Sequence, residues 1–523
     1  MANHILKNRR FITIATSTVL IFILFAFLQF KAKSGIVNFL NEKIPEHIQL
    51  VYDQIEVDLL TGSIGLTNVV LDIMERDTNS KQVEITIEAV DFEGVGYFGA
   101  FFGNTISVND LRFIRPKAKY YQANHSVENF EVLSNSMGGE RSLSITKTSI
   151  VDGEFRKIRK GTDSLDLLVE NFNLSLDHLK TDKDIIKQKI PISYEGYTLS
   201  TGNIFVDLGS FEVLTVNALN GRNKEVQLRN LSLRSKYNKK LLSEKLEKEH
   251  DFIVLEVPEV NLTELDFGFN SERFFIKTNA VTIKKPEVEI YRDKLIQDDF
   301  EQKKLYSRML REIPIDLDIS KIKISHGYIA YSELVKRGTV PGKIIFSNLE
   351  AIMNNVSNTY DNGEQTEIKA VAQLMGNAPI ELIWNFDSSK KNDAFYVSGV
   401  VKDFKSESIN QFLRSNLRTE AEGDVQELYF TFSGDAVSAS GNMKMKYQDF
   451  RFTVLKKDRT GVNKLLTFVG NIFTNDGSNT DEKGYRYGEL YAERDATKSF
   501  FNYLWLNVMD GIVNTLTGDG KKK

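Results

Sequence analysis

Alternation of apolar and polar residues is the feature that most constrains this chain. From about residue 48 onward, stretches such as 83–89 (VEITIEA) carry an apolar side chain at every second position. Successive side chains of an extended strand point to opposite faces, so this period predicts strands with one apolar and one polar face. We therefore expect more than ~40% of the residues in strands, against ~20–25% in an ordinary protein.

The clearest predicted apolar face lies near the C-terminus. Residues 428–432 and 443–447 alternate regularly, and the apolar positions then change from odd to even numbers at 450–454. Such a change requires an extra residue, which predicts a turn or β-bulge at 448–449. The residues predicted to share this face are Leu428, Phe430, Phe432, Met443, Met445, Tyr447, Phe450, Phe452 and Val454.

An internal repeat organises the strands. Four segments align in order with four later segments, and the offset rises from 162 through 170 and 174 to 177. A duplicated block with small insertions drifts in this way, whereas chance matches scatter. The aligned pairs are 63–73 with 225–235, 106–121 with 276–291, 145–155 with 319–329, and 167–176 with 344–353.

One segment, residues 11–30, is long and apolar enough to cross a bilayer. Its 20 uncharged residues span ~30 Å as a helix. Basic residues at 7–10 favour a cytoplasmic N-terminus. A cleaved signal peptide is the alternative, but its apolar region is usually only ~7–15 residues long. We expect an uncleaved anchor from Phe11 to Phe30, with the bulk of the chain outside the cytoplasm.

Three internal segments lack the strand period. Residues 241–250 and 297–311 are charged and are expected to be solvated loops or short helices. Residues 408–417 begin with Ser408 as a helix N-cap and place Ile409 and Phe412 on one helical face, which predicts a short helix covering the sheet.

The last predicted helix, residues 496–517, is amphipathic. A polar stripe of Asn502, Asn507, Asp510 and Asn514 excludes a membrane span. Packing on its own sheet, on a partner helix or on a bilayer surface are the alternatives. The residues predicted to form the apolar face are Phe501, Leu504, Trp505, Val508, Ile512 and Leu516.

Composition argues against several functional classes. A net charge of −4 and a pI near 6.0 argue against a nucleic-acid partner, because phosphate binding needs a concentrated basic face. The chain has no cysteine, and its 6 histidines are isolated. Residues 94–99 match G-x-G-x-x-G, but they lead into another predicted strand and not into the helix that a dinucleotide site needs. We expect no enzyme, no metal site and no cofactor.

These features together resemble the AsmA-like family of Bacteroidetes-type envelope proteins. The resemblance is carried by the basic N-terminus and single anchor, by TGSIGLTNVVLDI at 61–73, by I-x-V-x-x-L-x-F-x-x-P-x-x-x-Y at 106–120, and by C-terminal motifs at 422–430 and 441–447. It covers nearly the whole chain through short, degenerate motifs. The chain is short compared with members of the related TamB and bridge-like lipid-transfer proteins that form a complete bridge.

The resemblance implies a fold class and a function. The fold would be a transmembrane helix followed by an elongated, curved antiparallel β-sheet that forms a repeating β-groove, with a few short helices and a C-terminal amphipathic helix. The protein would sit in the inner membrane, face the periplasm and bind the acyl chains of phospholipid along the nine-residue apolar face, contributing to phospholipid transfer or outer-membrane homeostasis. The alternative is a non-catalytic envelope-assembly or translocon scaffold that binds proteins through sheet edges and through Phe501, Trp505, Val508 and Ile512.

Predicted domain boundaries follow from the anchor, the repeat and the final helix. The parts are 1–10 cytoplasmic, 11–30 anchor, 31–222 first repeat block, 223–365 second repeat block, 366–495 C-terminal β region, and 496–523 helix and basic tail.

Overall fold

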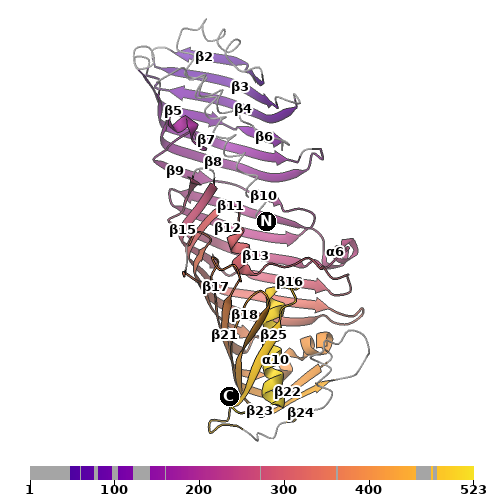
Figure 1. Cartoon of the computed structure of the whole chain (residues 1–523). Coiled ribbons are helices and arrows are strands. Elements are labelled where there is room, and N and C mark those ends of the chain that lie inside the picture. The colour runs from indigo at the N-terminus through magenta and orange to yellow at the C-terminus, as the bar shows by residue number, and fades with distance from the viewer. Residues whose placement is uncertain are drawn as a thin grey trace. The chain divides into compact units, whose positions relative to one another are not determined.

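A computed structural model gives the fold of the chain (Figure 1). It describes residues 47–58, 61–75, 80–96, 104–121, 142–159, 161–270, 273–360, 363–417, 419–454, 473–474 and 480–522, with only the backbone at 451–454 and 473–474. The chain divides into two compact units, Met1–Leu231 with Leu262–Ile276 and Ser232–Asn261 with Lys277–Lys523. Each unit has its own hydrophobic core.

Strands account for 62% of the described residues, which confirms the expectation of a mostly β protein. The strands are β1 (Ile48–Val51), β2 (Gln54–Asp58), β3 (Ser63–Met74), β4 (Lys81–Glu93), β5 (Thr105–Ile114), β6 (Lys117–Tyr121), β7 (Ser142–Ile158), β8 (Leu165–Thr181), β9 (Gly196–Ser200), β10 (Ile204–Asp207), β11 (Glu212–Arg222), β12 (Glu225–Ser235), β13 (Phe252–Thr263), β14 (Asp266–Asn270), β15 (Arg273–Lys284), β16 (Glu287–Asp293), β17 (Asp316–Leu334), β18 (Gly342–Ser357), β19 (Thr366–Leu374), β20 (Ala378–Phe386), β21 (Phe395–Lys405), β22 (Thr419–Gly434), β23 (Ser438–Val454), β24 (Phe473–Thr474) and β25 (Arg486–Glu493). The helices are η2 (Ile185–Lys187), α6 (Lys239–Lys245), α7 (Tyr306–Arg311), η3 (Ser406–Ile409), α8 (Asn410–Phe412), η4 (Leu413–Leu417) and α10 (Phe500–Thr517).

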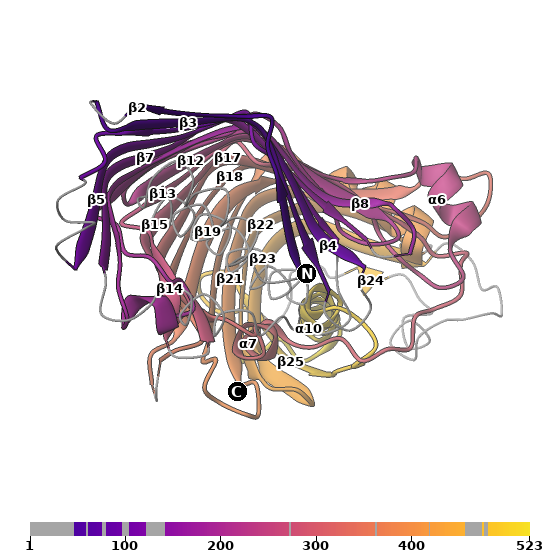
Figure 2. The same ribbon diagram turned by 90° about the horizontal axis from the view of Figure 1, so that it is seen from above.

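Long strands in both units contain a residue with left-handed backbone near their middle. Asn68, Asp152 and Asn171 have φ of 50°, 55° and 46°, and His326 and Asn348 have φ of 54° and 52°. The pairing register shifts at the last four of these positions, so each of the four is a β-bulge, whereas the register of β3 with β4 is the same on both sides of Asn68. Asn, Asp and His adopt this conformation more readily than most residues. The bulges explain why the long strands bend along their length (Figure 2).

The bulge predicted at 448–449 is present. β23 runs through this point without a turn, Asp449 has φ of 49°, and the register with β22 shifts between Glu422 and Asp424. Gly423 occupies the shift, and a Cβ there would lie 2.3 Å from the Asp449 carbonyl oxygen. The close approach of the two backbones therefore requires glycine.

Both copies of the predicted repeat have the same strand pairings. β6 lies antiparallel to β4 and parallel to β7, and β16 lies antiparallel to β13 and parallel to β17. The Glu154 amide donates to the Pro116 carbonyl, and the Tyr328 amide donates to the Pro286 carbonyl, each at 2.8 Å. These four residues are related by the sequence offsets of 174 and 170. The structure therefore matches the alignment residue by residue at this point.

The expectation of an antiparallel sheet is wrong where β7 runs parallel to β5 and β6, and where β17 runs parallel to β16. Parallel neighbours need a long crossover that returns the chain to the start of the next strand. In the second unit this crossover is residues 294–315, here called the strap, which includes α7. Residues 297–311 within the strap were expected to be solvated, but Leu305 and Leu310 are buried in the core.

The covering helix predicted at 408–417 is present as η3, α8 and η4. It begins at Ser406, and Ser408 is not its N-cap but donates its hydroxyl to the Lys405 carbonyl at 2.7 Å. Ile409 and Phe412 are buried as predicted. α6 lies partly within the charged segment 241–250.

The predicted anchor from Phe11 to Phe30 lies outside the described residues and stays a prediction. Within the part of the chain that the structure describes, no helix has both the length and the apolarity to cross a membrane. The structure also does not describe the side chains of Phe452 and Val454.

Candidate functional site

One face of the second unit is apolar from β17 to β25, and α7 and α10 lie on this concave side of the sheet (Figure 2). Strand registers place its residues in rows across the sheet. We call it the inner face. One row is Ile322, Met353, Ile368, Trp384, Val397, Phe432, Gly441 and Leu490, and the next is Ile324, Ala351, Ala370, Leu382, Gly399, Phe430, Met443 and Gly488.

Of the apolar residues predicted near the C-terminus, those whose side chains the structure describes belong to the closed part of this face. Met443 and Met445 are each 1% exposed. The other buried members are Leu428, Phe430, Phe432 and Phe450, while Tyr447 is half-buried. These candidate lipid-groove positions therefore lie in a packed core, and not on an open face, because helices cover them.

α10 forms that cover, and its backbone approaches the sheet closely. A Cβ on Gly488 of β25 would lie 2.5 Å from the Thr515 amide nitrogen, and a Cβ on Gly511 would lie 2.8 Å from the Met443 methyl carbon. Asn507 is fully buried, and its side-chain nitrogen donates to the Tyr503 carbonyl at 2.9 Å. Small residues at the contact allow the helix to sit directly on the strands.

Polar side chains of α10 form hydrogen bonds with backbone groups of β25, at the edge of the sheet. The Tyr491 amide donates to Asp510 Oδ2 at 2.8 Å, and Asn514 Nδ2 donates to the Glu489 carbonyl at 2.9 Å. The Tyr487 amide donates to the Gly520 carbonyl at 3.1 Å. These three groups of β25 point away from β23, so the helix and tail occupy bonding positions that an added strand would need.

The face of α10 predicted to be apolar is not its most buried face. The helix begins at Phe500, capped by Ser499, and its buried side chains include Phe500, Tyr503 and Thr515. Of the predicted partner residues, Phe501 is 59% exposed, and Trp505, Val508 and Ile512 are half-buried beside the core. Packing on its own sheet is therefore confirmed, although through a neighbouring face, and a partner at the exposed side stays a prediction.

The inner face is half-buried over β17–β20, and α10 meets this part of the sheet at Trp384. We call this part the open inner face. Its side chains are aliphatic apart from two aromatic rings, and they alternate with exposed residues such as Lys369 and Ile383 on the outer face. Its members are Ile322, Ile324, Phe346, Met353, Ile368, Ala370, Ile380, Leu382 and Trp384. The same alternation in residues 378–386 was available in the sequence but was not singled out there.

Three rings meet where the open inner face reaches α10. Trp384 stacks on Phe500 with centroids 4.5 Å apart and planes at 13°. Tyr306 of the strap lies edge-on to both, at 5.3 Å from Trp384 and 6.1 Å from Phe500. We call this cluster the aromatic wall. Sequence reasoning missed it because its members come from segments about 80 and 115 residues apart.

Ion pairs fasten the strap beside α10. Lys498 Nζ lies 2.8 Å from Asp298 Oδ2, and the Lys303 amide donates to the Ala496 carbonyl at 2.7 Å. Hydrogen bonding by Lys498 lowers the pKa of Asp298, and hydrogen bonding by Lys303 lowers the pKa of Asp299 to about 2. The Lys498–Asp298 pair thus holds the strap to the residues just before α10, in addition to the aromatic wall, whereas the Lys303–Asp299 pair lies within the strap.

Acid should loosen this attachment. A carboxylate whose pKa is lowered by folding stabilises the folded state above its unfolded pKa of ~4, and that stabilisation is lost as the pH falls through the folded pKa. Because the pKa of Asp298, the carboxylate that pairs with Lys498, is lowered, we expect the change below about pH 4. In a Trp505→Phe chain, the emission of Trp384 should shift to the red over this range. A shift already complete above about pH 5 would contradict this assignment.

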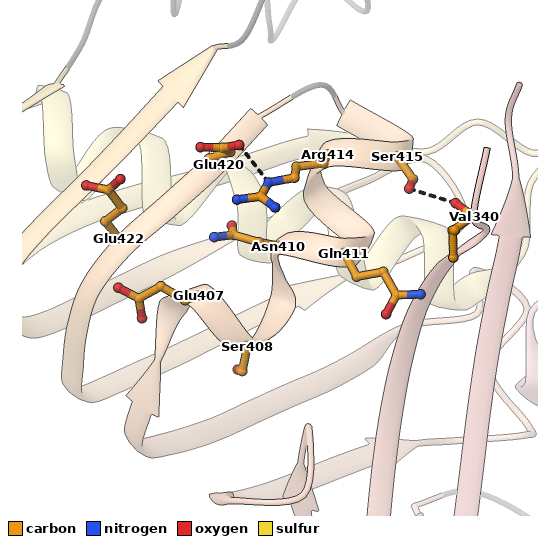
Figure 3. Close-up of a pocket in the computed structure, with 9 residues that line it drawn as sticks. All are labelled: Val340, Glu407, Ser408, Asn410, Gln411, Arg414, Ser415, Glu420 and Glu422. Atoms are coloured by element: carbon orange, nitrogen blue, oxygen red, sulfur yellow. Dashed lines mark hydrogen bonds and ion pairs between the residues drawn. The ribbon is translucent and has the colours of Figure 1, made fainter.

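A polar pocket of about 620 Å³ lies elsewhere in the second unit (Figure 3). Arg414 Nε pairs with Glu420 Oε1 at 2.6 Å, and the Ser415 hydroxyl donates to the Val340 carbonyl at 3.0 Å. Glu407 accepts the Gly423 amide at 2.9 Å. Its polar groups are thus largely engaged in hydrogen bonds and ion pairs within the protein. Across the described ranges, no three His, Asp or Glu side chains are grouped to hold a metal ion.

The fold and this face define a class: a β-repeat protein whose sheet has one apolar face, partly covered by a C-terminal helix. Comparison with protein-family models and with curated protein sequences gives no match.

Proposed function

We propose that this protein is an AsmA-like, membrane-anchored periplasmic protein that binds lipid acyl chains without catalysis. The observation that carries the proposal is the open inner face, where nine neighbouring residues, mostly aliphatic, stay half-buried while the same sheet face is fully buried under α10. Contiguous apolar surface of this kind marks a binding site in a folded protein. Each methylene that an acyl chain buries there contributes ~0.8 kcal/mol.

The binding mode that we propose uses many weak contacts. Aliphatic side chains such as Ile368 and Leu382 offer dispersion contacts that depend little on the position of the chain along the face. A bound chain could therefore slide, which transfer between membranes requires. The single-pass anchor at residues 11–30 would keep this face close to the inner membrane, as the resemblance implies.

Fluorescence quenching tests the proposal, because the chain has only 2 tryptophans. Replacing Trp505 by Phe leaves Trp384, on the open inner face, as the only reporter. We expect brominated palmitate to quench Trp384 in the full-length protein, and unbrominated palmitate to reverse the quenching by competition. Absence of quenching at saturating probe would contradict acyl-chain binding on this face.

A scaffold function is the second candidate, and one observation favours it. Tyr306, Met309 and Phe501 are 38%, 50% and 59% exposed, and the rings of Tyr306 and Phe501 lie 6.2 Å apart. Exposed aromatic and Met side chains are typical of protein interfaces. Under this function Phe501→Ala would release a bound envelope protein from the full-length chain and leave the quenching of Trp384 unchanged.

A further inference from the structure

The aromatic wall lies at the end of the open inner face. The row of Ile322, Met353 and Ile368 leads across three strands to Trp384 on β20. The next residue of the row, Val397 on β21, is fully buried. A chain that follows this row therefore reaches Trp384 and finds no accessible face beyond it.

The wall is a built feature, because separate contacts fix each ring. Phe500 is 4% exposed and packs edge-on against Phe395, with centroids 5.2 Å apart. Trp384 stacks on Phe500, and its Nε1 atom is buried, so it presents its ring and not its polar atom. The wall therefore offers apolar surface to whatever meets it.

Buried polar contacts position Tyr306 from within the strap. The hydroxyl of the adjacent Ser307 donates to Asp393 Oδ1 at 3.0 Å, and Arg311 Nη2 lies 2.9 Å from the same oxygen. Arg311 also donates to the carbonyls of Ser388 and Lys390 at 2.8 and 2.9 Å. Asp393 is only 5% exposed. These contacts hold α7, and with it Tyr306, over the end of the face.

The neighbouring strand β16 and the C-terminal end of β17 carry charged residues. Arg292 on β16 forms two hydrogen bonds of 2.7 Å with Asp251, and it pairs in register with Glu333 on β17. A polar headgroup is more stable beside such groups and water than against aromatic rings. The charged groups thus lie at the far end of β17 from Ile322, and the aromatic wall lies where the row reaches β20.

We propose that the aromatic wall of Tyr306, Trp384 and Phe500 is where the methyl end of a bound acyl chain stops, so that these residues set how far the chain enters. The inference rests on the proposed function and adds an orientation and an end point to it. In this arrangement α10 is an end wall, and lipid does not run past β20.

The position of the bromine on the probe tests this inference. In the full-length Trp505→Phe chain, palmitate brominated near its methyl end should quench Trp384 several times more strongly than palmitate brominated near its carboxylate. Tyr306→Ala, at a position that is 38% exposed and so tolerant of change, should reduce this preference because the chain end is no longer held.

The outcomes separate the two proposals. Equal quenching by both probes, or stronger quenching by the carboxylate-end probe, would contradict the wall and leave acyl-chain binding intact. A methyl-end preference that Tyr306→Ala does not change would also contradict a role for the wall. No quenching by either probe would overturn the proposed function itself.

Discussion

Met445→Asp should unfold the second unit, whereas Leu382→Asp should leave it folded and abolish acyl-chain binding. Met445 is 1% exposed under α10, so a carboxylate there would be buried without a partner, at a cost of several kcal/mol. Leu382 lies on the open inner face and is only half-buried, so water can reach a carboxylate there when no lipid is bound. Denaturant unfolding measures the first effect, and brominated-palmitate quenching of Trp384 measures the second.

Ile383→Asp is the matched control for this pair. Ile383 is the next residue of β20, points to the outer face and is 37% exposed. It adds the same charge to the same strand, and we expect both stability and quenching to stay near those of the parent chain. If Met445→Asp proved as stable as Ile383→Asp, the closed core under α10 would be wrong.

Gly488→Val should detach α10 from the sheet. The new Cβ would lie 2.5 Å from both the amide nitrogen and the hydroxyl oxygen of Thr515. The Thr515 backbone is part of α10 and cannot rotate away as a flexible side chain can. The whole helix must therefore move away from the sheet and expose the residues beneath it. We expect a loss of several kcal/mol of stability, of the size seen when large core side chains are truncated, together with self-association through the uncovered β25 edge.

Gly65→Val is the control for this substitution. Gly65 also lies in a strand, but a Cβ there would meet only the Asp91 carboxylate, at 3.7 Å. Valine suits a strand better than glycine does, so we expect no loss of stability. Equal destabilisation by both substitutions in thermal unfolding would show that the effect of Gly488→Val does not come from contact with α10.

The sequence predicted strands, a bulge and a repeat because each leaves a local or periodic trace. Period 2 reports directly which side chains share a face, as at Val83, Ile85 and Ile87, which are all buried in β4. The change of the apolar positions from odd to even residue numbers near 448 predicted the bulge found at Asp449. The repeat was visible because bulge and turn residues recur at fixed offsets, as with Asn171 and Asn348.

Parallel pairing and burial depth leave no such trace. The strap has a charged sequence, which predicts solvent exposure. Its charged side chains instead pair with groups such as Lys498, which is distant in sequence. The buried face of α10 was missed because it relies on Asn507, Gly511 and Thr515, which score as polar or neutral although close packing needs them. The spacing of four residues between Asn507, Gly511 and Thr515, which places them on one helical face, was the signal that could have indicated it.

The same limit applies to the candidate site. Period 2 placed Met443 and Met445 on an apolar face but could not tell an open face from a covered one, because both have the same pattern. What distinguishes them is the position of α10, which depends on contacts across the chain. The open inner face therefore lies on β17–β20, and the residues first predicted for it form the core beside it.

Site-specific photo-crosslinking in cells tests the central claim most directly. A photoreactive amino acid at position 368 would lie on the open inner face, and at position 369, the next residue of β19, on the outer face. Acyl-chain binding predicts phospholipid adducts at position 368 and none at position 369. Protein adducts at position 368, or no adduct there while the full-length chain is folded, would contradict acyl-chain binding on this face.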